Sequence, residues 1–87
     1  MANDQLKEKI YQVLTKGYFN SSRDLVDVSD GSGDLIHLVV VSRKFDGNRM
    51  MERHNLIWSE LTQKLAPEEW SQISLSVGMS PEEIKAM

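Results

Sequence analysis

The sequence contains no cysteine and only two histidines among its 87 residues. The absence of thiols excludes disulfides, thiolate nucleophiles and metal sites that need cysteine ligands from this chain. The longest unbroken apolar run, residues 38–41, is far shorter than the roughly 20 residues that a membrane-spanning helix needs. The first residues also lack the basic start and apolar core of a signal peptide, so we expect a cytoplasmic protein.

Neither sign of charge dominates the chain, whose formal net charge is -3. The overall basic field of a nucleic-acid-binding protein is therefore absent, and any such role would need a local patch. With 40% hydrophobic and 26% charged residues, the composition is that of an ordinary globular protein. The length leaves room for one domain only, which we place over residues 1–87.

The first half of the chain predicts a helix followed by a hairpin. Leu6, Ile10 and Leu14 recur at helical spacing after Asn3 or Asp4, either of which can cap the helix. Short strands are expected at 25–28 and 35–41, because turn-forming residues separate these two β-branched runs. The second strand is apolar on both alternating faces, which is typical of a strand that is covered on both sides or lies centrally in its sheet.

The second half predicts a long helix, a third strand and a short last helix. Proline at position 67 ends the long helix, because the residue before a proline avoids the α region. The third strand follows from Ile73, Leu75 and Val77, which alternate with serines. Ser80 to Glu83 has the pattern of a capping box with proline at the first helical position. The expected apolar face of the long helix consists of Met50, His54, Ile57, Trp58, Leu61 and Leu65.

These elements predict an α+β fold with the order α-β-β-α-β-α. The connection from the second strand through the long helix to the third strand is long enough for a parallel crossover. We therefore expect a three-stranded mixed sheet packed by helices.

A small basic island surrounds the start of the long helix, where only two acidic residues oppose four basic ones. The four basic residues are Arg43, Lys44, Arg49 and Arg53. Two of these arginines are four residues apart on one helix face, so both can meet phosphates or the carboxylates of a partner. A solvated helix face without a ligand explains the same pattern. The Gly-x-x-Gly clamp that KH domains use on RNA is missing after Gly47.

The two histidines are most simply interpreted as hydrogen-bonded imidazoles on apolar surfaces. His54 lies on the expected apolar face of the long helix, and His37 alternates with apolar residues on the second strand. A partner-facing or metal-facing role is the alternative for His54. Neither histidine has a second ligand at metal-binding spacing, and no motif for a nucleophile or a nucleotide is present. We expect a protein that is neither an enzyme nor a metal-binding protein by itself.

One pattern combines the strand end at 39–42, Phe45 and Gly47, and Arg53-His54 leading into an apolar helix. With this pattern, residues 45–58 resemble the BolA-like family, whose fold is KH-like and in which Phe45 and Gly47 would act as fold determinants. Ser80-Pro-Glu-Glu also looks like the Thr-Pro-Glu-Glu that follows the last strand in this family.

The resemblance implies a non-enzymatic partner of monothiol glutaredoxins in iron-sulfur or iron homeostasis. Family members that share a cluster use a cysteine or histidine in the first hairpin turn and a histidine at the start of the last strand. This chain has residues 32–35 (Ser-Gly-Asp-Leu) and 71–73 (Ser-Gln-Ile) there, so it resembles a divergent member without the usual cluster ligands. Serine and glutamine are poor ligands for a soft iron-sulfur centre.

Three functions follow as hypotheses. The first is an adaptor that holds no cofactor alone and binds a protein, such as a monothiol glutaredoxin, through Arg49, Arg53 and His54. The second is a transcription regulator that binds nucleic acid through the basic island. The third is an oligomerising module, such as a homodimer, without a ligand.

Overall fold

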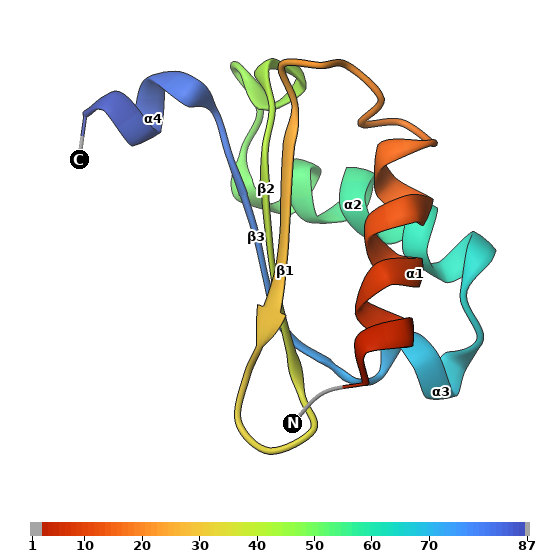
Figure 1. Ribbon diagram of the computed structural model, residues 1–87. Helices are drawn as coiled ribbons and strands as arrows, with labels where there is room; N and C mark the ends of the chain where they lie inside the picture. Colours follow the sequence, from red (N-terminus) through yellow and green to blue (C-terminus); the bar gives the residue numbers. More distant parts are fainter. Residues whose placement is uncertain (1–2, 87) are drawn as a thin grey trace.

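The computed structural model describes residues 3–86 and has the predicted order of elements (Figure 1). None of the helices in this range has the length and apolar character that crossing a membrane requires. The elements are α1 (Asp4–Thr15), β1 (Leu25–Asp30), β2 (Ile36–Val41), the 3₁₀ turn η1 (Arg43–Phe45), α2 (Met50–Lys64), α3 (Pro67–Trp70), β3 (Ile73–Met79) and α4 (Pro81–Lys85).

The three strands form one mixed sheet in the order β1-β2-β3. β1 pairs antiparallel with β2 through the hairpin, and β3 returns parallel to β2 after α2. The α+β prediction and the central position of β2 are thus confirmed. Helices α1 and α2 lie on one face of the sheet, whereas in the described chain no helix covers the other face and α4 stands at one end of it (Figure 1). β2 is therefore central but covered by helices on one side only.

The core lies between the sheet and the two long helices. The apolar side chains that are fully or almost fully buried there come from α1, β2 and α2: Ile10, Leu14, Ile36, Leu38, Val40, Ile57 and Leu61. Aromatic rings close the core at the end of the sheet where η1 lies, since Phe45 packs 5.4 Å from Phe19, centroid to centroid. Gly47 follows with a φ of 77°, a left-handed conformation that favours glycine.

The ends of the helices follow the expected capping chemistry. Asn3 accepts hydrogen bonds from the amides of Gln5 and Leu6 at 2.8 and 3.2 Å. At α4, the Glu83 carboxylate accepts from the Ser80 amide at 2.7 Å, and the Ser80 hydroxyl accepts from the Glu83 amide at 3.4 Å. These contacts satisfy amides that the first helical turn leaves without partners. Residues 67–70, which follow the predicted end of the long helix, form the short helix α3, because a proline at its first position is compatible with a helix start.

A register shift in β3 changes which of its side chains face the core. Ile36 pairs with Ile73, but His37 pairs with Leu75, so one extra residue is inserted in β3. Ile73 is buried in the core, whereas Leu75 lies on the uncovered face and is 47% exposed. The alternation predicted one shared face for Ile73, Leu75 and Val77, and this was wrong. The inserted residue moves Ser76 and Gly78 to the helix-covered face instead.

The first turns of α2 also differ from the prediction. Arg53, Ile57 and Leu61 are its buried residues, whereas Met50 and His54 are exposed. The prediction that His54 belongs to the apolar face that packs on the core was therefore wrong, and the arginine beside it points inward in its place.

The register of β3 can be tested by truncating one leucine on each face of the sheet. Leu38→Ala should lower the free energy of unfolding by about 2–5 kcal/mol, because it removes a fully buried side chain. Leu75→Ala should cost less than about 1 kcal/mol, because this side chain is half exposed. Urea denaturation of both variants measures the difference, and equal losses would contradict the shifted register.

Candidate partner-binding site

Arg53 is an internal residue that joins three elements. The residue is 7% exposed, and its side chain donates from Nε to the Asn48 carbonyl at 3.0 Å and from Nη1 to the Gly78 carbonyl at 3.2 Å. The same nitrogen pairs with the Glu83 carboxylate of α4. A Cβ on Gly78 would lie 3.2 Å from the Cβ of Arg53, so the glycine permits this close approach. The prediction that the Arg53 guanidinium faces a partner or a phosphate disagrees with this burial.

Lys44 is likewise engaged within the chain. Its ammonium pairs with Asp24 at 3.2 Å, donates to the Tyr18 carbonyl and lies 4.8 Å from the centroid of the Tyr18 ring. The buried Ser42 hydroxyl donates to the other oxygen of Asp24 at 2.7 Å. Lys44 therefore fastens the loop before β1 to the start of η1.

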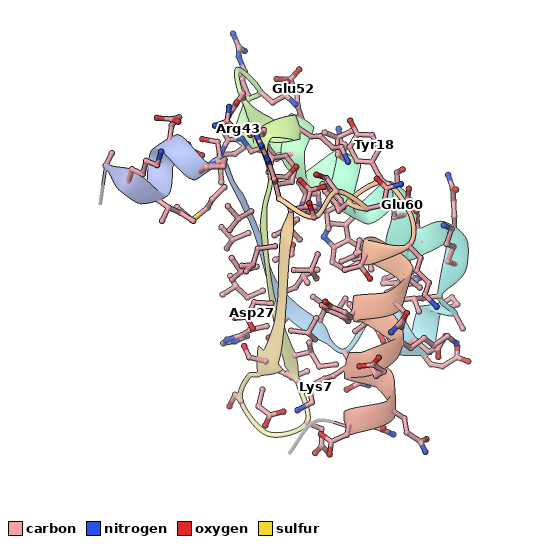
Figure 2. The ribbon with its side chains drawn as sticks, turned by 45° about the horizontal axis from the view of Figure 1, so that its top comes forward. Lys7, Tyr18, Asp27, Arg43, Glu52 and Glu60 are labelled. Atoms are coloured by element: carbon pink, nitrogen blue, oxygen red, sulfur yellow. The ribbon has the colours of Figure 1, made fainter. Side chains whose placement is uncertain are left out.

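Arg43 and Arg49 remain as the exposed cations of the basic island. Within residues 3–86 neither forms an ion pair, and Arg43 lies with Glu52 at the end of the molecule opposite Lys7 (Figure 2). Glu52 accepts from the backbone amide of Arg49 at 2.7 Å. Lys44 and Arg53 have partners within the chain. The basic island therefore presents two cations to an outside ligand, whereas the nucleic-acid hypothesis assumed that all four were available.

His54 stacks on the outer surface of α2 against Trp58, with ring centroids 5.7 Å apart and planes tilted by 27°. The indole nitrogen of Trp58 donates to the Ser76 hydroxyl of β3 at 2.9 Å. A second indole, that of Trp70, meets Trp58 edge-on at 5.9 Å. These ring contacts hold the imidazole of His54 at the surface next to β3.

A groove of about 420 Å³ runs between the start of α2 and β3. Met50 and Met51, which are 58% and 76% exposed, form its outer wall. Thioether side chains adapt to apolar partners of varied shape, so exposed methionines favour protein binding. Met51 was not among the predicted site residues. The signal was that two successive methionines at a helix start cannot both lie on the helix face that packs on the core. The lining residues are Met50, Met51, His54, Ile57, Ser76 and Gly78.

A second hollow, of about 520 Å³, lies at the other end of the sheet. It brings together Asp34 in the hairpin turn and Gln72 just before β3, the two places to which the BolA-like resemblance assigns cluster ligands in other family members. The other polar residues lining it also offer oxygen or amide groups: Asn3, Glu68 and Glu69. These donors do not fit an iron-sulfur cluster, which prefers thiolate or imidazole. Among residues 3–86, no three histidines or carboxylates are grouped to hold a metal ion.

His37 lies on the uncovered face of the sheet, between Ser29 and Leu75. Its ring leaves no room for a side chain at Gly31, where a Cβ would be 2.8 Å from the imidazole. The face carrying His37 also carries Asp27, which projects away from α1 (Figure 2). His37 and His54 therefore belong to separate surfaces and form no joint site.

The ion pair between Arg53 and Glu83 predicts how the docking of α4 depends on pH. Hydrogen bonds from the Arg53 guanidinium and then from the Ser80 amide lower the pKa of Glu83. Because the pKa is lowered, the ion pair stabilises the docked α4 fully at pH values above the ordinary pKa of a glutamate. This stabilisation is lost as the pH falls through the pKa of Glu83. Acid titration followed by NMR shifts of α4 should show this loss. Glu83→Gln should remove most of the response, whereas Glu82→Gln should retain it, and an equal response in both variants would contradict the role of the pair.

No family model matches the chain. It is similar to the protein named Protein BOLA2 from Arabidopsis thaliana, with 28% identity over 79 residues that cover 91% of this chain and 83% of the relative. The element order and the mixed three-stranded sheet are also those that the BolA-like resemblance implies. The similarity covers the hairpin, the long helix and the last strand together. In sequence and in fold, the chain resembles the BolA-like family.

Proposed function

We propose that the protein is a non-enzymatic adaptor that acts by binding another protein, with monothiol glutaredoxins of iron-sulfur or iron homeostasis as the partner class. The groove between α2 and β3 is the observation that carries this proposal. Its exposed methionines and its indole-stacked His54 provide an apolar surface beside the cation Arg49. Such a mixture of apolar contact area and a rim charge is typical of protein recognition.

The chemistry of the hollow around Asp34 and Gln72 supports an adaptor without a cluster of its own. Carboxylates and amides line this hollow, and Glu69 is already bound to Lys9 at 2.7 Å and to the Ala66 amide at 2.9 Å. Any cluster handled in the complex would therefore take its thiolates from the partner. The adaptor would contribute shape and charge to the complex.

Enzymatic action is not part of the proposal, because the exposed groups of the groove are suited to contact. Thioethers and a guanidinium bind side chains and carboxylates, whereas catalysis by a side-chain nucleophile requires an adjacent base. The imidazole of His54 packs on Trp58 at the groove.

The adaptor role can be tested by titrating the ¹⁵N-labelled protein with a monothiol glutaredoxin that carries its cluster. Saturable shifts should appear at the amides of Met51, His54 and Ser76, because these residues line the groove. Met51→Ser should weaken binding about fivefold or more, as expected for the loss of an apolar contact. Leu75→Ser, on the opposite face of the same sheet, is the matched control.

A parallel titration with a duplex oligonucleotide at low salt tests the nucleic-acid hypothesis. Binding to DNA with a steep salt dependence, together with no response to the glutaredoxin, would replace the adaptor by a nucleic-acid-binding protein. A response to neither ligand, with a mass that rises with concentration, would favour the oligomerising module.

Because the hollow lacks soft ligands, introducing one there should add a ligand for the cluster that the glutaredoxin carries. Gln72→His should change the visible circular dichroism of the cluster in the glutaredoxin mixture, because an imidazole then lies at the hollow. Ser71→His, at an exposed neighbouring position that does not line the hollow, should leave the spectrum as it is with the native protein. A native spectrum already equal to that of the Gln72→His variant would mean that the native chain contributes a ligand.

A further inference from the structure

The groove beside α2 lies along an open edge of the sheet. β3 is the last strand in the order β1-β2-β3, so its outer side has no neighbouring strand within the described chain. The carbonyl of Met79 accepts from the Ser42 amide at 3.0 Å, which places the backbone groups of Met79 toward β2. Since successive residues of a strand point their amides and carbonyls to opposite sides, those of Ser76 and Gly78 point outward.

The two outward-facing residues are not equivalent. The Gly78 carbonyl is occupied by the Arg53 guanidinium at 3.2 Å, which blocks that end of the edge. The Ser76 hydroxyl accepts a hydrogen bond from Trp58. The backbone amide and carbonyl of Ser76 point away from β2, and this residue lines the groove. An unpaired strand edge of this kind is a template for another extended chain.

The walls of the groove specify which side chains such a chain would carry. A residue beside Ser76 whose side chain points to the helix-covered face would meet Met50 and His54, which favours an aliphatic group. Arg49 directly precedes Met50, is exposed and has no ion pair within residues 3–86. Because Glu52 binds the backbone amide of Arg49, the guanidinium is left for a carboxylate from outside.

We propose that β3 and this groove bind an extended segment of a partner protein as a fourth strand, with an aliphatic side chain between Met50 and His54 and an acidic residue at Arg49. This inference rests on the proposed adaptor function and states how the partner is recognised. A partner helix would satisfy its own amides and leave the edge of β3 unused, whereas a strand uses the edge and the groove together. Charge complementarity at Arg49 favours an acidic segment over the backbone of a nucleic acid, which would need more than one or two free cations.

The test uses the full chain and an acetylated, amidated heptapeptide of alternating valine and threonine that begins with glutamate. Binding should slow hydrogen exchange at the Ser76 amide and shift the resonances of Met51 and His54. The same peptide with its three central amides N-methylated keeps every side chain but loses the strand hydrogen bonds, so its binding should be lost. Equal binding of the two peptides would overturn the inference.

Two variants and one control examine the side-chain contacts. Arg49→Glu and Met51→Ser should each weaken the peptide about fivefold or more, and both change exposed residues, so the melting temperature should stay near that of the native protein. Leu25→Ser, an exposed position on β1 at the opposite edge of the sheet, should bind the peptide like the native protein. Shifts confined to the face carrying Leu75, or protection of Ser76 by a second copy of the chain in sedimentation and exchange experiments, would overturn the proposal.

The outcome is separable from that of the adaptor function. Binding of the glutaredoxin with no peptide binding at millimolar concentration would overturn strand addition and leave the adaptor function in place. Peptide binding that is sensitive to N-methylation, with no response to the glutaredoxin, would support strand addition and remove the glutaredoxin as the partner.

Discussion

The buried guanidinium of Arg53 is the contact on which the arrangement of the C-terminal half depends. It is bound by the carbonyls of Asn48 and Gly78 and by the carboxylate of Glu83, so it joins the start of α2, the end of β3 and α4. A buried cation is tolerated only when such partners replace its lost hydration. Because this contact draws α2 against β3, it also sets the position of the groove walls and leaves Met50, Met51 and His54 outside.

The two ends of the sheet differ in the chemistry that they offer. At one end, the groove combines thioethers and a stacked imidazole beside an open strand edge, and the exposed cation Arg49 directly precedes Met50 in the chain. At the other end, carboxylates and amides line the hollow around Asp34 and Gln72. The first set suits contact with protein, and the second lacks the soft ligands of an iron-sulfur centre. The fold therefore agrees with the one that the BolA-like resemblance implies, while the hollow offers carboxylates and amides.

Much of the fold could be predicted because its signals are local. The cap at Asn3, the capping box at Ser80 and the proline at the first position of α3 act within one helical turn, and the hairpin turn acts over a few residues. The site was harder to predict. Arg49 and His54 were named and are exposed, whereas Arg53 and Lys44 are engaged internally by partners that are 20 or more positions away in the chain.

The sequence by itself determined the elements, their order and the lack of thiol chemistry, since periodicity, capping and composition are properties of neighbouring residues. Only the tertiary structure decided which faces these elements present. One inserted residue in β3 turned Leu75 and Val77 away from the helices, and the glycine at 78 made room for an arginine in place of the histidine beside it. Both outcomes depend on packing between distant segments, where a shift of one residue reverses the face of a strand.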